Sequence, residues 1–139
     1  MNKYRFVVDT NVLVSSIAFP NKLPSQALRK AISEGVLVFS QDTIAEFKDV
    51  LLRPKFDRYI GKRLREAFLV EIVTSALLVN SSPCKVTCRD PNDQKFLDIV
   101  DSGDVDFLVS GDKDLLVLEK TGKCSIVSPA EFLQSLLLP

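Results

Sequence analysis

The apolar residues of this chain form two kinds of segment that alternate. Short and almost wholly apolar runs predict buried strands, at residues 4–9, 36–39, 105–109 and 125–127. Between them, apolar residues recur at the spacing of a helix, which predicts helices at residues 10–17, 25–34, 44–51, 64–77, 96–100 and 129–136. Apolar strands that alternate with helices indicate a mostly parallel sheet covered on both faces. The predicted fold class is therefore α/β, a three-layer α/β/α sandwich.

Prolines, glycine and capping residues mark the ends of several elements. Two prolines predict a loop at residues 19–24, after which Ser25 is expected to cap a helix that Gly35 ends. Ser128-Pro129-Ala130-Glu131 is a capping box with proline at the first helical position. It predicts a last helix whose apolar face reaches Leu136.

The composition is that of one soluble domain. With 139 residues and 46% apolar side chains, the chain is expected to fold as a single domain over residues 1–139. No apolar run approaches the about 18 residues of a membrane helix, and the first residues lack a signal-peptide pattern. We therefore expect a cytoplasmic protein with no membrane partner. Eighteen basic and 18 acidic residues cancel, so any nucleic-acid binding must come from local clusters of cations.

Histidine is absent from the sequence, which excludes several kinds of site. Ser-His-Asp triads, Cys-His pairs and His-rich zinc sites all require it. The three cysteines, Cys84, Cys88 and Cys124, are interpreted as free thiols, since their spacing is unusual for zinc and no histidine can complete a ligand set. If the protein is an enzyme, we expect its catalytic groups to be carboxylates that hold a hard cation.

Four acidic residues fall at strand ends or helix starts. Asp9 and Asp112 follow two apolar strands, and Glu46 and Asp93 are expected in the first turns of helices. Each residue alone has an ordinary alternative: Asp9 and Asp112 as caps, Glu46 completing a capping box with Thr43, and Asp93 as a helix-start acid after Asp90-Pro91.

Together, the four acids indicate a shared site at one rim of the sheet. Carboxylates packed against one another repel and raise one another's pKa unless a cation neutralises them. Mg²⁺ and Mn²⁺ prefer oxygen ligands, and Mg²⁺ commonly joins one or two carboxylates to a substrate phosphate. The acids therefore favour metal-dependent phosphodiester chemistry, which needs no histidine base.

Three segments carry a family resemblance. Val7-Val8-Asp9-Thr10-Asn11, Arg89-Asp90-Pro91-Asn92-Asp93 and Ser110-Gly111-Asp112-Lys113-Asp114 resemble motifs of the PIN-domain ribonucleases, in the same order along the chain. More narrowly, the chain resembles the PIN-type toxins of type II toxin–antitoxin pairs. The resemblance implies a Rossmann-like α/β/α sandwich, Mg²⁺- or Mn²⁺-dependent cleavage of RNA, a small antitoxin as partner, and a homodimer.

The resemblance also implies roles for individual residues. Asp9, Glu46, Asp93 and Asp112 would be the catalytic, metal-binding acids, with Asn11 and Ser110 as polar supports. Family members more often have threonine at the position of Ser110. Asp114 is either an auxiliary ligand for a second metal or an acid favoured at a helix start. Asp90 is an alternative to Asp93 as the ligand, but it is interpreted as a cap because it precedes Pro91.

A basic and aromatic segment lies between Arg53 and Arg65. It predicts contacts with an RNA backbone through Arg58, Lys62 and Arg63, although a solvated helix face explains the same cations.

Three other interpretations of the acidic pocket are weaker. A receiver-type signalling domain usually has two adjacent acids after its first strand, and here Thr10 and Asn11 follow Asp9. A D-x-D phosphatase fails because Asn11 occupies the position of its second acid. A non-catalytic RNA-binding PIN module is disfavoured by the complete set of acids.

Overall fold

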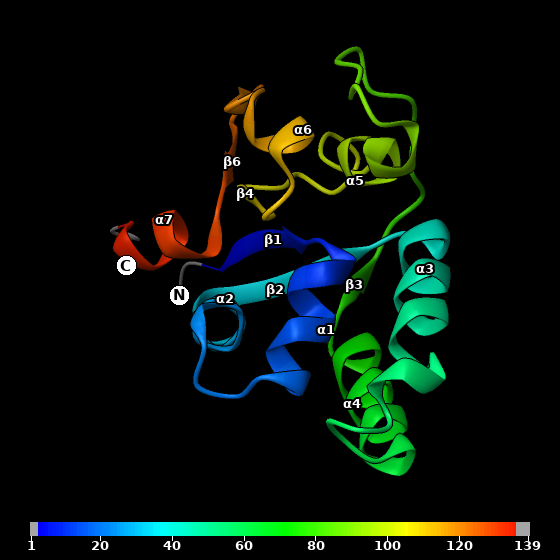
Figure 1. The fold of residues 1–139 in the computed structure, drawn as a ribbon. Helices are drawn as coiled ribbons and strands as arrows, with labels where there is room; N and C mark the ends of the chain where they lie inside the picture. Colours follow the sequence, from blue (N-terminus) through cyan, green and yellow to red (C-terminus); the bar gives the residue numbers. More distant parts are fainter. Residues whose placement is uncertain (1–2, 136–139) are drawn as a thin grey trace.

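A mixed, mostly parallel sheet forms the centre of the computed structural model, which describes residues 3–135 (Figure 1). Within those residues the strand order is β3-β2-β1-β4-β6-β5, and all neighbours are parallel except β5 and β6. The strands are β1 (Tyr4–Val8), β2 (Gly35–Phe39), β3 (Leu77–Leu78), β4 (Phe107–Val109), β5 (Lys120–Thr121) and β6 (Cys124–Val127). The predicted α/β class is confirmed.

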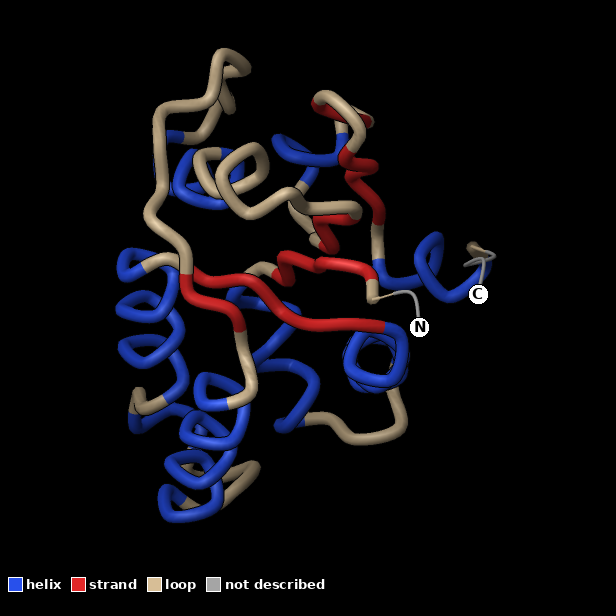
Figure 2. Tube along the Cα trace, turned by 180° about the vertical axis from the view of Figure 1, so that it is seen from behind, coloured by secondary structure: helices blue, strands red, loops and turns tan. Residues whose placement is uncertain are grey.

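Helices cover both faces of the sheet, as Figures 1 and 2 show. One layer contains α1 (Thr10–Ala18), α2 (Leu23–Glu34), α3 (Gln41–Leu51) and α4 (Lys62–Thr74), and the other contains α5 (Gln94–Leu97) and α6 (Lys113–Leu116). The chain also forms the 3-10 turns η1 (Pro54–Phe56) and η2 (Pro91–Asp93), and α7 (Pro129–Gln134) follows β6. No helix in the described part of the chain has the length and apolarity needed to cross a bilayer.

Alternate residues of the central strands enter two separate cores. Phe6 and Val8 of β1 pack with α1 to α4 and with Phe132 of α7, whereas Val7 packs on the other face with Phe96 and Leu115. Because successive side chains of a strand point to opposite faces, a strand buried on both sides must be apolar throughout. This is why the strands could be predicted as short apolar runs.

Several predicted boundaries are wrong. The second helix begins at Leu23 after Lys22, so Ser25 is not its cap. Leu77 belongs to the short strand β3, because α4 ends at Thr74. The helix predicted at 96–100 is the short α5, and β4 starts at Phe107. The first error arises because Pro24 is tolerated in the first turn of a helix. The errors at Leu77 and at 96–100 share another cause: apolar residues packed on the core beyond a helix end have the same spacing as a helix face.

Other end signals are confirmed. Ser128 and Glu131 form the predicted capping box at the start of α7, whereas Leu136 lies outside the described residues. Gly35 does end α2, and it is also the first residue of β2. A Cβ at this position would lie 1.9 Å from the carbonyl oxygen of Tyr4, so only glycine allows the two strands to pair here.

The basic segment is held in place by one buried cation. Arg65 has no exposed surface, and its guanidinium donates hydrogen bonds to the carbonyl oxygens of Leu51, Arg53 and Ile60 and to the carboxylate of Asp57. A guanidinium group has five N–H donors in a rigid plane, so one arginine can donate to several acceptors at once. Arg65 is therefore a structural residue that fixes the connection between α3 and α4.

Replacing Arg65 with methionine should lower the free energy of unfolding by about 3 kcal/mol, because three carbonyl groups lose a buried donor. Urea denaturation followed by circular dichroism measures this change. Arg63→Met removes an equal charge from an exposed position two residues earlier and should change stability by less than about 0.5 kcal/mol. Equal stability of the two variants would contradict the structural role of Arg65.

Candidate metal centre

Asp9 lies where β1 passes into α1, and its backbone fixes its direction. Its N–H donates to the carbonyl oxygen of Val109 at 3.0 Å, which extends the β1–β4 pairing by one step. One carboxylate oxygen accepts from the N–H of Val12 at 2.9 Å and caps α1. The other accepts from the hydroxyl of Ser110. Burial of Asp9, opposed in part by these hydrogen bonds, raises the pKa of its carboxyl group.

Ser110 connects Asp9 to Asp112. Its side chain is fully buried directly after β4, and its hydroxyl, besides donating to Asp9, accepts from the N–H of Asp112 at 2.9 Å. Asp112 in turn accepts from the N–H of Asp114 at 2.8 Å, which caps α6. The cap interpretations of Asp9 and Asp112 are thus correct, and in both residues capping directs the carboxylate toward the same rim of the sheet.

Asp93 is a second carboxyl group of the centre whose pKa is raised. Burial and then the neighbouring Asp112 carboxylate raise the pKa of Asp93 to about 7. Its Oδ2 atom is buried and has no hydrogen-bond partner among the described residues. Carboxylate oxygens of Asp90, Asp93 and Asp112 lie within 4.8 Å of one another. Asp90 caps η2 through the N–H of Asn92, as predicted, and it also belongs to this group.

Glu46 lies one turn further along its helix than predicted. The first turn of α3 is capped by Ser40 and Thr43, which form the capping box themselves, so Glu46 is not part of it. One oxygen of Glu46 accepts from the hydroxyl of Thr10, and the other pairs with the Lys95 ammonium group at 2.6 Å. The side chain therefore reaches the rim from the second turn of α3.

These acids surround one hollow of about 220 Å³. Its wall contains all four predicted acids together with Asp90, and Asn11 and Asn92 add amide groups. Asn11 is exposed and also lines a second hollow, beside Asp9 and Asp112. The buried Oδ2 of Asp93 lacks a donor and the other donors are oxygens, so the residues fit a hard divalent cation such as Mg²⁺ or Mn²⁺.

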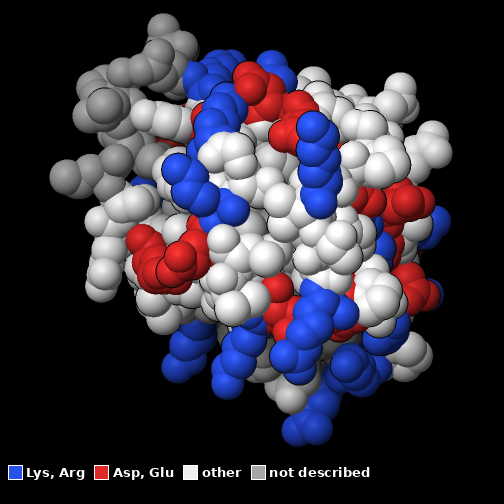
Figure 3. Space-filling model, turned by 90° about the horizontal axis from the view of Figure 1, so that it is seen from above, with Lys and Arg blue, Asp and Glu red and all other residues white. Residues whose placement is uncertain are grey.

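The remaining predicted residues lie outside this hollow. The Asp114 carboxylate faces Arg89, at 3.6 Å from its Nε, and is not among the clustered acids. Arg58, Lys62 and Arg63 are exposed near the start of α4, which Figure 1 places beside the last turn of α3, whereas Glu46 of the hollow lies in the second turn of α3. Figure 3 shows lysines and arginines in separate groups with acidic side chains between them, as expected of a chain without net charge.

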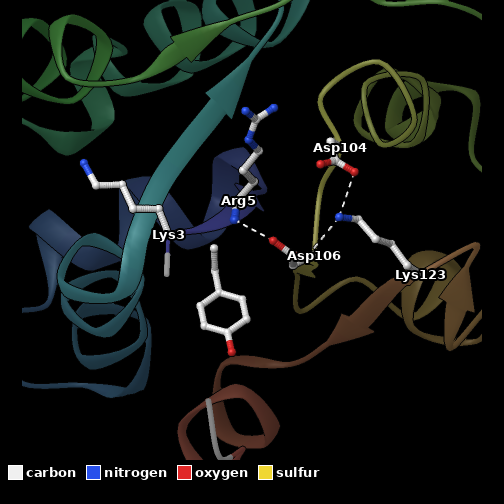
Figure 4. A pocket seen from close by; sticks show the side chains of 6 residues that line it. Lys3, Arg5, Asp104, Asp106 and Lys123 are labelled. Atoms are coloured by element: carbon white, nitrogen blue, oxygen red, sulfur yellow. Dashed lines mark hydrogen bonds and ion pairs between the residues drawn. The ribbon is translucent and has the colours of Figure 1, made fainter. Parts of the chain in front are cut away.

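A second charged hollow lies at the opposite ends of the strands (Figure 4). Lys123 pairs with Asp104 at 2.7 Å and with Asp106 at 3.3 Å, and Asp106 accepts from the N–H of Arg5 at 2.8 Å. Arg5 also donates to the carbonyl oxygen of Gly103. Both carboxylates have cationic or N–H partners, so this network leaves neither of them in need of a metal.

The thiols take no part in the acidic group. Cys84 is half-buried, Cys88 and Cys124 are buried, and all three are free, as predicted. Burial raises the pKa of Cys124 to about 12, and burial raises that of Cys88 as well. The single group of three or more candidate ligands within residues 3–135 consists of aspartates.

Two residues of this group were not assigned to the site from the sequence. Asp90 was weighed as a ligand in place of Asp93 and was then interpreted as a cap, and Lys95 was not considered. The available signal was proximity along the chain, because Asp90 caps η2, Asp93 ends it and Lys95 lies in α5 directly after it. Sequence alone could not show which of these side chains face the strand ends.

Comparison with known proteins identifies the family of this chain. The family model of the PIN domain matches residues 5–114, and the chain belongs to that family. The uncharacterized protein MJ1680 of Methanocaldococcus jannaschii is 27% identical over 142 aligned residues, which cover 95% of this chain and 91% of that protein.

Solved structures share the fold at low sequence identity. PAE2754 from Pyrobaculum aerophilum superposes with a TM-score of 0.58 at 16% identity, covering 94% of this chain and 88% of that one. VapC20 from Mycobacterium tuberculosis, described as a sarcin-ricin loop cleaving toxin, gives 0.55 at 11% identity, covering 84% and 96%. VapBC2 from Rickettsia felis, bound to a fragment of its promoter DNA, gives 0.58 at 13%, covering 89% and 98%.

Without metal, the protein should lose stability as the pH rises through 7. The pKa of Asp93 is raised in the folded protein from 3.8 to about 7, so the folded state holds a proton that the unfolded chain releases. That stabilisation is complete below about pH 4 and is lost as the pH passes about 7. Melting temperatures in EDTA should therefore fall between about pH 4 and 7 and level off above that range. Asp93→Asn should flatten this fall, and an equally steep fall in that variant would assign the proton to another group.

Proposed function

We propose that this protein is a divalent-metal-dependent endoribonuclease, the toxin of a toxin–antitoxin pair. The observation that carries the proposal is the acidic hollow of a PIN domain, in which the buried Asp9 and several half-buried carboxylates converge and the Oδ2 atom of Asp93 has no partner among the described residues. Supporting it, two structures with the same fold are named as VapC or VapBC proteins, one of them a sarcin-ricin loop cleaving toxin. The substrate would be RNA and the cofactor Mg²⁺ or Mn²⁺.

Each acidic residue would have a definite part in this activity. Asp9, Asp93 and Asp112, with Glu46 at the wall formed by α3, would hold and surround the ion, while Ser110 keeps Asp9 and Asp112 in position. A bound divalent ion would supply a water of lowered pKa and neutralise phosphate charge. Asn11, exposed at the rim, would donate to phosphate or sugar oxygens. Asp114, paired with Arg89, could reach an ion only by leaving that pair.

The proposed partners follow from the same assignment. A toxin of this kind would be neutralised by a small cognate antitoxin, would work in the cytoplasm and would form a homodimer. These proposals rest on the named VapBC relative and on the family, and a short reading frame next to the gene would support them.

Asp9→Asn and Asp93→Asn should each abolish metal-dependent cleavage of a labelled RNA without unfolding the domain. Mn²⁺ should raise the melting temperature of the wild type by mass action and should fail to raise that of either variant. In EDTA the variants should melt at or above the wild-type temperature, because carboxylate repulsion is relieved.

The matched control for these variants is Asp101→Asn, an exposed aspartate outside the hollow. It should cleave RNA and respond to Mn²⁺ as the wild type does. Cleavage retained by both hollow variants would contradict the proposed site. Binding of RNA without cleavage by the wild type would instead favour the non-catalytic PIN module.

Replacing Arg58, Lys62 and Arg63 together with glutamine should weaken RNA binding. Because these cations lie away from the acidic hollow, the cleavage rate at saturating RNA should stay near the wild-type value. Each lost phosphate contact should reduce the log–log salt slope by about 0.7 for single strands.

Fluorescence titrations at several salt concentrations, with every protein also carrying Asp93→Asn, measure this effect. A control with Lys3, Arg29 and Lys120 replaced by glutamine removes the same charge from exposed positions elsewhere. Equal slopes of log binding constant against log salt in the two triple variants would show that the basic segment is an ordinary solvated surface that does not contact RNA.

A further inference from the structure

Within the described residues, Lys95 is the one cation that forms an ion pair with a carboxylate lining the acidic hollow, and two bonds define its position. Its ammonium group lies 2.6 Å from Oε2 of Glu46 and 2.8 Å from the carbonyl oxygen of Asn92. The side chains of Lys95 and Glu46 are only 24% and 26% exposed. A fully exposed ion pair contributes little, but here both side chains are half-buried, and the ammonium group is fixed between η2 and α3.

Glu46 and Asp93 differ in what their oxygens meet. Both oxygens of Glu46 already accept hydrogen bonds, one from Thr10 and the other from Lys95. Asp93, in contrast, has a buried oxygen, Oδ2, with no hydrogen-bond partner among the described residues. One carboxylate oxygen of Asp93 also lies within 4.8 Å of carboxylate oxygens of Asp90 and Asp112. The hollow therefore has an aspartate side that lacks positive charge and a glutamate side that already contains it.

A second ion at Glu46 would compete with Lys95 for one oxygen. Mg²⁺ binds carboxylate oxygen at about 2.0–2.1 Å, and the ammonium group holds the same atom at hydrogen-bond distance. The lysine is attached to the chain two residues after Asp93, so its effective concentration at Glu46 is that of an intramolecular group. An ion that takes this oxygen must displace a tethered cation.

We propose that Lys95 fills the place of a second cation at Glu46, so that the centre takes one divalent ion on its aspartate side. This inference rests on the proposed function and adds to it the number of ions and a positioning residue. Glu46 then belongs to the centre through Lys95 and Thr10, and Asp90 joins Asp93 and Asp112 as a third carboxylate on the side that receives the ion.

Titration of the metal-free chain with Mn²⁺, with free ion measured by electron paramagnetic resonance, tests the inference without an activity assay. The wild type should bind about one ion per chain, and Lys95→Met should bind about two, because Glu46 becomes available. The double variant Lys95→Met/Glu46→Gln should return to about one ion, since the second site requires Glu46. Lys113→Met, which removes an exposed lysine next to Asp112, should behave as the wild type.

The outcomes separate this inference from the proposed function. A wild type that binds two ions, or a Lys95→Met variant that gains none, overturns the role of Lys95 while leaving a metal-dependent nuclease in place. A wild type that binds no Mn²⁺ contradicts the proposed function itself. Circular dichroism of each variant checks folding, and Lys95→Gln, which keeps a neutral donor near Glu46, provides the same test if the methionine variant does not fold.

Discussion

The arrangement of this domain depends on how carboxylates coexist at the carboxyl ends of its parallel strands. Asp9 and Ser110 directly follow β1 and β4, which pair with Val8 opposite Val109, so the sheet itself brings the Asp9 carboxylate and the residues after β4 together. Buried carboxylates repel and lose hydration. The fold offsets this with the N–H of Val12 and the hydroxyl of Ser110 at Asp9, and with the N–H of Asp114 at Asp112.

Hydrogen bonds offset the carboxylate charge on only one side of the hollow. The other side therefore favours a bound proton or cation. Glu46 has a hydroxyl and an ammonium partner, whereas the buried oxygen of Asp93 has none and the pKa of its carboxyl group rises to about 7. A proton or a divalent cation can supply the missing charge. Folding therefore leaves the negative charge of the Asp93 carboxylate uncompensated, and a bound cation can compensate it.

Much of the fold could be predicted because burial on both faces requires apolar strands. The runs that became β1, β2, β4 and β6 are continuous in the sequence, and the capping boxes and prolines are local signals that need no tertiary information. Short elements could not be predicted in this way. The strands β3 and β5 have two residues each, and their pairing with β2 and β6 is decided by neighbours distant in the chain.

The sequence by itself determined which charged side chains follow the strands: without histidine, and with Asp9 and Asp112 at strand ends, it predicted an oxygen-ligand site on the sheet rim. Only the tertiary structure decided which residues lie at this site. Glu46 reaches the rim from the second turn of α3, Asp90 combines capping with a place in the acidic group, and Lys95 meets a glutamate 49 positions away. The physical reason is that the sequence specifies which side chains carry charge, whereas the distances between charges, which set their energies, arise when α3, η2 and the strand ends pack together.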